Sequence, residues 1–346
     1  EFDLGDPVNL QANPNCGWTF DHWDDGTLCY ADNPWTVVMD GSKEVDAVFS
    51  PIVSTISVVP DTAQGSVYSN EELPFIHCDD SENSICSYGY SWDASVTLKA
   101  EPKPGYVFSH WEENGITVST EREYCFLVEG SRELVPVFEE FRLGFPLMGY
   151  TPYDAPISSV FDHSATAQYD NDTDHHVTAF NGESSEDQGA YSGTTCYPKA
   201  DNLAFLESVL SNYVGYGSAG EYYLCYDGHP GYDYVVSYVD VYSAAEGVVL
   251  GAGYDSCLGN NVTIQHKGGY KTRYFHLDSI DTNNVQLNQH IGPGIRIGMS
   301  GNTGTCSDGS HLHFQVEDEN NEPIDPYGWS GTENDPYPIK NATLWQ

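Results

Sequence analysis

The sequence predicts a mainly β protein in which two small repeat modules precede a domain built on an antiparallel sheet. Three observations support this prediction. Aromatic residues make up 13% of the 346 residues, and 33 Gly and 19 Pro supply many turns. Apolar and polar residues alternate in short runs, which is typical of half-buried strands. A stretch near the N-terminus recurs later in the chain, which indicates a duplicated module.

The duplication begins with residues 8 to 23, VNLQANPNCGWTFDHW, which align without gaps on residues 96 to 111, VTLKAEPKPGYVFSHW, with 8 of 16 positions identical. Each copy continues into a second matching stretch, VVMDGSKEVDAVF at 37 to 49 and FLVEGSRELVPVF at 126 to 138. The acidic residue and glycine near the middle of each second stretch predict a hairpin turn there.

These stretches resemble the divergent internalin-B-type repeats of bacterial secreted and surface proteins. The resemblance implies one small β module per copy, repeat 1 at residues 1–52 and repeat 2 at residues 53–140, which positions, inhibits or tethers the rest of the chain. His22 and His110 stand at matching places beside a Trp. Packing beside a buried Trp is the expected role of these histidines, and a metal or ligand pair is the alternative.

Residues 140 to 156, EFRLGFPLMGYTPYDAP, interrupt the repeat pattern and mark a boundary. We assign residues 141–219 to a linker and N-terminal extension, and residues 220–346 to the second domain. The extension contains alternating acidic residues followed by two histidines, which predicts a solvated acidic loop, with a second metal site as the alternative. The residues concerned are Asp170, Asp172, Asp174, His175 and His176.

The net charge is -40 at pH 7, from 52 acidic against 12 basic residues. A field of this sign repels nucleic acid, so we expect no nucleic-acid partner. No apolar run is long enough to span a bilayer, so no membrane insertion is predicted. The chain starts without a basic region and an apolar stretch, and we expect any signal peptide to have been removed.

Nine cysteines without a CxxC spacing predict disulfides and an oxidising compartment. Nearness within one module suggests four pairs and leaves Cys125 over. The suggested pairs are Cys16 with Cys29, Cys78 with Cys86, Cys196 with Cys225, and Cys257 with Cys306.

The second domain carries histidines in three short motifs: HPGYD at 229 to 233, RYFHLD at 273 to 278 and GSHLHF at 309 to 314. His229 and Asp233 lie four residues apart around a Pro-Gly bend and can converge on one ion, which a strand histidine can complete. His311 and His313 share one face of a strand because side chains alternate. A pair of structural histidines on a wet strand face is the alternative.

In this order, with AAEGVV and GNTG between them, the motifs resemble the lysostaphin and LytM type of zinc metalloendopeptidase, the β-lytic metallopeptidases, over roughly residues 220 to 328. The resemblance implies a LytM-like antiparallel sheet with an active-site groove and one catalytic Zn²⁺. His229, Asp233 and His313 match the zinc ligands of the family. His276 and His311 match its catalytic histidines, one the general base and one the oxyanion stabiliser, in either assignment.

Phe275 departs from the family, in which a smaller residue commonly precedes the histidine. A Cys257 to Cys306 bridge would clamp two loops beside the site, and both cysteines are expected to be structural. Several tyrosines either line the groove or pack as ordinary sheet aromatics: Tyr222, Tyr223, Tyr226, Tyr232 and Tyr234. Other histidines match no motif and are expected on the surface or in the core: His163, His266 and His290.

The resemblance thus implies a secreted or periplasmic bacterial enzyme that hydrolyses peptide bonds, in peptidoglycan cross-links or in Gly-rich proteins, through zinc-activated water. Two other classes stay open. One is a catalytically silent protein that binds the cell wall or regulates a hydrolase, and the other is an adhesin that attaches to a surface through the N-terminal repeats. The presence of every matched ligand and catalytic residue favours the enzyme.

Overall fold

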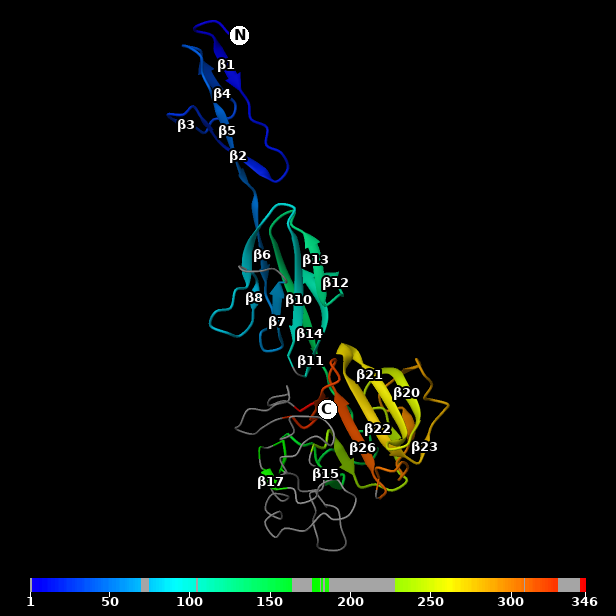
Figure 1. Ribbon diagram of the computed structural model, residues 1–346. Coiled ribbons are helices and arrows are strands. Elements are labelled where there is room, and N and C mark those ends of the chain that lie inside the picture. Colours follow the sequence, from blue (N-terminus) through cyan, green and yellow to red (C-terminus); the bar gives the residue numbers. More distant parts are fainter. Residues whose placement is uncertain are drawn as a thin grey trace. The chain divides into compact units, whose positions relative to one another are not determined.

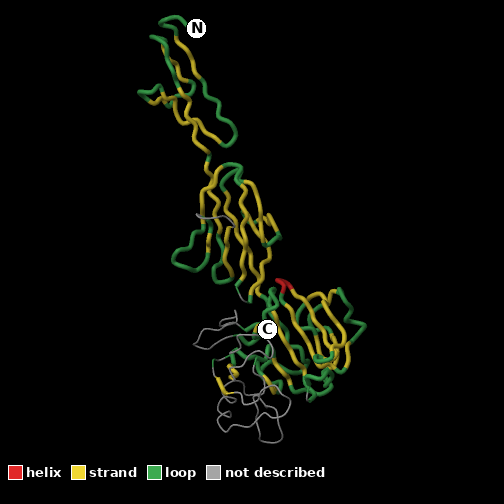
Figure 2. Tube along the Cα trace, viewed as in Figure 1, coloured by secondary structure: helices red, strands yellow, loops and turns green. Residues whose placement is uncertain are grey.

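A computed structural model describes residues 2–69, 75–103, 105–163, 176–180, 182, 184–186, 228–307, 309–328 and 343–346. Its regular structure is almost entirely strand (Figure 2), and the described residues contain a single helical turn, η1 (Lys267–Gly269). The predicted mainly β class is confirmed. None of the described segments forms a helix that is both long and apolar enough to cross a membrane. The chain divides into two compact units, Glu1–Glu139 and Glu140–Gln346.

The first repeat forms two small antiparallel sheets. Its strands are β1 (Pro7–Leu10), β2 (Trp18–Asp24), β3 (Cys29–Tyr30), β4 (Trp35–Val38) and β5 (Asp46–Pro51). Strand β1 pairs with β4, while β2 lies between β3 and β5. The indole of Trp23 is buried on β2 and donates a hydrogen bond to the carbonyl of Asp32, 3.1 Å away.

The second repeat has the same strand pairing with four added strands. Its strands are β6 (Val53–Val58), β7 (Gly65–Ser69), β8 (His77–Cys78), β9 (Ser87–Ser91), β10 (Ser95–Pro102), β11 (Tyr106–Glu113), β12 (Ile116–Ser119), β13 (Glu123–Leu127) and β14 (Arg132–Glu140). Strand β10 pairs with β13, and β11 lies between β12 and β14. The fully buried Trp111 repeats the indole hydrogen bond of the first copy, here to the carbonyl of Glu121. The shared pairing agrees with the duplication in the sequence.

The predicted hairpin in the second half of each repeat is wrong. Strands β4 and β5 join different sheets, and so do the equivalent strands β13 and β14. Each of these strands pairs with a strand from the first half of its repeat, so the turn between them connects two sheets. The sequence alternation identified the strands, but it carries no information on which strand pairs with which.

His22 and His110 are half-buried next to their tryptophans, and each lies near a carboxylate. Nδ1 of His22 is 3.6 Å from Asp21, and Nε2 of His110 is 2.9 Å from Glu112. Neither histidine belongs to a group of three metal-ligating side chains in the described part of the chain. The structure therefore gives no support to the metal alternative at these positions.

Two of the suggested disulfides, Cys78–Cys86 and Cys257–Cys306, are confirmed, and Cys125 is unpaired. The pairing of Cys16 with Cys29 is wrong, since both thiols are free. Cys16 precedes the start of β2 and Cys29 lies opposite Asp24 at its end. A strand rises about 3.3 Å per residue, so the length of β2 keeps the two far beyond disulfide reach. Cys196 and Cys225 lie outside the described residues.

The second unit is organised around one large sheet, coloured from green to red in Figure 1. Its strands are β15 (Ile157–Ser159), β16 (His176–Thr178), β17 (Ser184–Glu186), β18 (Tyr232–Tyr234), β19 (Asp240–Tyr242), β20 (Gly247–Asp255), β21 (Gly259–His266), β22 (Lys271–Leu277), β23 (Ser279–Ile280), β24 (His290–Ile291), β25 (Arg296–Met299), β26 (Leu312–Glu317) and β27 (Pro323–Ile324). The large sheet has the order β15-β18-β26-β22-β21-β20-β24, with β27 added beside β26. Strands β19, β25 and β23 form a smaller sheet, and β16 pairs with β17.

One face of the large sheet packs into the core of this unit. Tyr232, Phe314 and Tyr274 lie side by side on β18, β26 and β22, and all three are fully buried. The hydroxyl of Tyr232 donates to Asp325, and that of Tyr234 lies 3.2 Å from the hydroxyl of Tyr327. These two sequence-predicted tyrosines are therefore core residues and do not line a groove.

The remaining sequence predictions for this unit divide into two groups. His163 and His266 are buried and His290 is exposed, within the expectation of core or surface positions. Other predictions lie outside the described residues or concern side chains that are not described: Tyr222, Tyr223, Tyr226, and the acidic stretch from Asp170 to His176.

Candidate metal site

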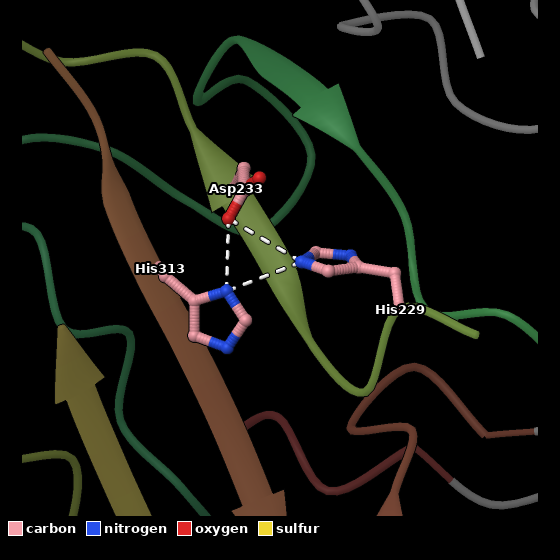
Figure 3. A group of neighbouring side chains, drawn as sticks. All are labelled: His229, Asp233 and His313. Atoms are coloured by element: carbon pink, nitrogen blue, oxygen red, sulfur yellow. Dashed lines mark hydrogen bonds and ion pairs between the residues drawn. The ribbon is translucent and has the colours of Figure 1, made fainter. Parts of the chain in front are cut away.

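His229, Asp233 and His313 come together at the face of the sheet opposite the aromatic core. Figure 3 shows the three side chains pointing toward one another, with Asp233 on β18, His313 on the neighbouring β26, and His229 in the segment just before β18. Asp233 lies directly opposite His313 in the strand register. All three are buried, and they form a group of possible metal-ligating side chains in the described residues.

The atoms that face one another are Nε2 of His229, Oδ1 of Asp233 and Nδ1 of His313. Nδ1 of His313 lies 3.0 Å from Oδ1 of Asp233 and 3.1 Å from Nε2 of His229. The remaining distance, from Nε2 of His229 to Oδ1 of Asp233, is 3.5 Å. The three atoms therefore form a small, nearly equilateral triangle.

The hydrogen bond made by Nδ1 of His229 determines which ring nitrogen carries the hydrogen in the neutral ring. Nδ1 of His229 lies 2.9 Å from the carbonyl oxygen of Val160. A carbonyl only accepts, so Nδ1 carries the hydrogen, and in the neutral ring Nε2 presents a lone pair. That lone pair meets a carboxylate oxygen and a second imidazole nitrogen. Three electron-pair donors so close together require a proton or a cation between them.

Burial and mutual attraction act against each other in this cluster. Burial alone would raise the pKa of Asp233, but the neighbouring His229 and His311 hold that pKa well below its usual range. Burial opposes a charge on His229, yet Asp233 outweighs it and raises the pKa of this histidine. Burial lowers the pKa of His313 in spite of Asp233. The site thus favours a carboxylate with positive charge beside it.

Residues 160–162, which precede the three histidine motifs in the sequence, hold His229 and its neighbour Gly228 by hydrogen bonds. Besides the Val160 carbonyl, the backbone N–H of Asp162 donates to the carbonyl of His229 at 2.9 Å. The carboxylate of Asp162 accepts from the N–H of Gly228 at 2.9 Å. No sequence pattern predicts this role, because residues 160–162 make two of the three contacts with backbone atoms that any residue supplies.

His313 is oriented by packing. Its ring stacks on Phe275 of β22, with ring centroids 4.9 Å apart and planes within 10°. Its Nε2 is buried and has no hydrogen-bond partner among the described residues. Gly231 lies against the same nitrogen, since a Cβ there would be 3.1 Å from Nε2 and 2.6 Å from the Phe314 carbonyl oxygen. The large Phe275 is therefore part of the support of the site.

His276 and His311 lie next to this group, with ring centroids 4.7 Å apart. Nδ1 of His276 donates to the carbonyl of Thr303 at 3.0 Å, and Nδ1 of His311 donates to the carbonyl of Gly309 at 2.9 Å. Nε2 of His311 is 3.6 Å from Oδ1 of Asp233. Both rings thus use Nδ1 as donor and leave Nε2 as the accepting nitrogen.

His276 reaches this position through an unusual backbone conformation. Tyr274 faces the core and Phe275 faces the site, so regular alternation would turn His276 back to the core. Its φ of 60° interrupts the alternation and directs the ring toward His311. Burial, with His311 and His313 nearby, lowers the pKa of His276 to about 4, so the ring is neutral near pH 7. The structure therefore brings together all five residues that the sequence singled out.

Comparison with known proteins assigns families to both parts of the chain. Residues 227–326 match the model of peptidase family M23, and residues 1–53 and 82–141 match the divergent InlB B-repeat domain. The peptidoglycan DD-endopeptidase ShyA of Vibrio cholerae serotype O1 is 40% identical over 89 residues, which are 25% of this chain and 20% of ShyA. The DD-carboxypeptidase/endopeptidase Mpg of Neisseria meningitidis serogroup B is 34% identical over 99 residues, which are 28% of this chain and 22% of Mpg.

Among solved structures, the catalytic domain of the antimicrobial peptidase lysostaphin from Staphylococcus simulans aligns with 29% of this chain and 77% of its own length. The identity is 28% and the TM-score is 0.27. The chain spans about a fifth of the length of the two curated relatives. By its family matches, the chain carries a peptidase family M23 domain, of the lysostaphin and LytM type, preceded by divergent InlB B-repeat domains.

Proposed function

We propose that the chain is a zinc metalloendopeptidase that hydrolyses peptide bonds in peptidoglycan. The observation that supports this most strongly is the convergence of Nε2 of His229, Oδ1 of Asp233 and Nδ1 of His313. Two imidazoles and a carboxylate are a ligand set of catalytic zinc sites, which leave a fourth position open. The match to peptidase family M23 over residues 227–326 supports the reaction class.

The spacing of the three atoms fits one zinc ion. Ligands at about 2.0–2.1 Å from a tetrahedral zinc lie ~3.3 Å from one another. The three distances in the cluster are 3.0, 3.1 and 3.5 Å, so only small adjustments are needed. Nδ1–H of His229 donates to a backbone carbonyl, which is the usual second partner of a zinc-bound histidine.

The two other histidines supply proton transfer. When bound, zinc lowers the pKa of a water molecule and polarises the scissile carbonyl. His276 and His311 each have Nδ1–H bound to a carbonyl, so Nε2 of either ring can accept a proton. A ring that has accepted the proton becomes a donor and can stabilise the oxyanion or protonate the leaving amine. We assign these residues to the general-base and oxyanion roles, in either order.

Peptidoglycan is the substrate class that the comparisons favour, because ShyA is named as a peptidoglycan DD-endopeptidase and Mpg as a DD-carboxypeptidase/endopeptidase. This substrate implies a secreted or periplasmic location. The net charge of -40 disfavours a wall rich in anionic teichoic polymers at low salt. A Gly-rich protein is the second candidate, since glycine lets an extended backbone approach a metal closely.

We propose that the N-terminal repeats attach the protein to a surface. The proposed domain boundaries are 1–52 and 53–140 for the two repeats, 141–219 for the extension and 220–346 for the peptidase domain. Deleting residues 1–139, the first compact unit, separates attachment from hydrolysis. We expect the shortened chain to cleave soluble fragments and to lose binding to sedimented cell walls. Unchanged wall binding would overturn the attachment role.

The enzyme proposal is tested by mass spectrometry of products released from purified peptidoglycan and from elastin, with and without a chelator. We expect cleavage that the chelator abolishes. His313→Ala should lose both zinc and cleavage, whereas His276→Ala and His311→Ala should retain zinc and lose cleavage. Robust cleavage by metal-stripped protein would refute the enzyme mechanism, and zinc binding without cleavage of either substrate would favour the silent wall-binding alternative.

A further inference from the structure

Two loops meet beside His276 and are joined by a disulfide. The first, residues 255–259, connects β20 to β21, and the second, described over residues 301–307 and 309–310, lies between β25 and β26. Cys257 in the first loop is bonded to Cys306 in the second, 49 residues later. Both cysteines lie outside the metal cluster, and neither takes part in the proposed chemistry.

The loops also touch through their backbones. A Cβ on Gly259 would lie 2.2 Å from the carbonyl oxygen of Thr303, and one on Gly304 would lie 2.1 Å from that of Cys257. Both glycines have positive φ, 66° and 91°, which only glycine adopts freely. The two loops therefore approach as closely as bare backbone permits.

Each loop contacts His276 directly. The carbonyl of Leu258 accepts the backbone N–H of His276 at 2.9 Å. The carbonyl of Thr303 accepts Nδ1–H of the imidazole at 3.0 Å. One loop thus fixes the left-handed backbone of His276, and the other fixes the rotation and tautomer of its ring.

The hydrogen bonds between the loops are made by residues that are exposed or half-buried. The carbonyl of Ser256 accepts from the N–H of Thr305 at 2.8 Å and from its hydroxyl at 3.1 Å, and the N–H of Cys306 donates to the carbonyl of Cys257 at 3.2 Å. At the end of the first loop, the N–H of Asn260 donates to Oγ1 of Thr303 at 2.9 Å. Thr305 and Ser256 are exposed, and an exposed hydrogen bond exchanges readily with water. The disulfide links the loops covalently, so water does not compete with it.

We propose that the Cys257–Cys306 disulfide positions His276 for catalysis by keeping the carbonyls of Leu258 and Thr303 in register around it. This inference rests on the proposed function and concerns how its proton-transfer group is held. Without the bridge, we expect the Thr303 carbonyl to move with its loop. The tautomer of His276 is then no longer fixed, and its Nε2 no longer points in one direction. The metal cluster, held by β18, β26 and the 160–162 segment, stays intact.

The test compares the full-length double variant Cys257→Ser/Cys306→Ser with Cys78→Ser/Cys86→Ser, which removes the disulfide of the second repeat. A misaligned catalytic group commonly costs tenfold or more in turnover, so we expect kcat of the first variant to fall by about 10- to 100-fold with KM within about twofold. Bound zinc should be unchanged in both variants, and kcat of the second should equal that of the wild type.

Three outcomes would overturn the proposed positioning of His276 by the disulfide. They are an unchanged kcat in a folded, zinc-loaded Cys257→Ser/Cys306→Ser protein, an equal loss of kcat in the Cys78→Ser/Cys86→Ser control, and a rise in KM alone. A second readout does not need activity. Nitrogen-15 NMR of the imidazole should show hydrogen fixed on Nδ1 of His276 in the wild type and averaged between the ring nitrogens in the variant. Identical spectra of the wild type and the variant would overturn the positioning role of the disulfide. If the spectra differ but the wild type shows no cleavage that a chelator abolishes, the positioning role is supported and the proposed function is refuted.

Discussion

Replacing Gly231 with alanine tests how closely β18 and β26 must pack to assemble the metal site. Gly231 lies between His229 and Asp233 in sequence, directly before β18. In space it lies against β26. A Cβ at this position would come 2.6 Å from the carbonyl oxygen of Phe314 and 3.1 Å from Nε2 of His313. Ordinary contacts of a Cβ lie at 3.4–4 Å, so the added methyl group clashes with backbone that cannot rotate away.

The clash must be relieved by moving one strand away from the other. Overpacking of this kind costs about 1–3 kcal/mol of unfolding free energy. The same movement separates Asp233 from His313, which face each other across the two strands 3.0 Å apart. We therefore expect Gly231→Ala to lower the unfolding free energy and also to weaken zinc binding by about tenfold or more, since misplaced ligands lose affinity.

Gly253→Ala is the matched control. Gly253 lies on β20 of the same sheet, and a Cβ there would have no atom within 4 Å. Its unfolding free energy should stay within about 0.5 kcal/mol of the wild type, as for other surface substitutions. Urea unfolding measures stability, and competition with a fluorescent zinc chelator measures affinity. Equal stability and zinc affinity of Gly231→Ala and Gly253→Ala would refute the close packing of the site.

Three further predictions follow from the fold and the site. The Cys257–Cys306 bridge joins residues 49 positions apart, and the Cys78–Cys86 bridge joins residues 8 positions apart. When each pair is changed to serine, the chain-entropy model predicts that the unfolding free energy falls by about 4 and about 2.5 kcal/mol, respectively, which urea unfolding measures. Burial lowers the pKa of His266 below its usual 6.5, so the unfolded chain binds the proton more tightly and stability falls as pH drops below about 6.5. His266→Gln should flatten this dependence between about pH 7 and about pH 5.5; an unchanged slope would show that His266 does not cause it. Asp162→Ala removes the carboxylate that accepts from Gly228, and we expect zinc affinity to fall by a few-fold without loss of the fold, measured by zinc competition and circular dichroism.

Side-chain periodicity predicted a large part of the candidate site. The alternation in GSHLHF placed His311 and His313 on one face, and both lie near Asp233 while Leu312 and Phe314 are fully buried. The four-residue spacing around Pro230 and Gly231 predicted the approach of His229 to Asp233. These predictions succeeded because they depend on local geometry, which a strand or a tight bend fixes within a few residues.

Long-range pairing could not be predicted in the same way. The hairpins expected in each repeat and the Cys16 to Cys29 pair both assumed that neighbours in sequence are neighbours in space. The structure instead places β4 and β5 in separate sheets and puts the length of β2 between the two cysteines. The position of His276 depends on one residue with positive φ and on two backbone carbonyls, which leave no mark in side-chain patterns.

Under the proposed function, one zinc ion held by His229, Asp233 and His313 is required for hydrolysis. The experiment adds zinc stepwise to metal-stripped, full-length protein while peptidoglycan cleavage and bound metal are measured together. We predict that cleavage rises in proportion to bound zinc, reaches its maximum at one ion per chain, and does not appear in Asp233→Ala at the same zinc concentrations. Full cleavage before zinc is added, or equal zinc-dependent cleavage by Asp233→Ala, would show that a zinc ion at these three residues is not required.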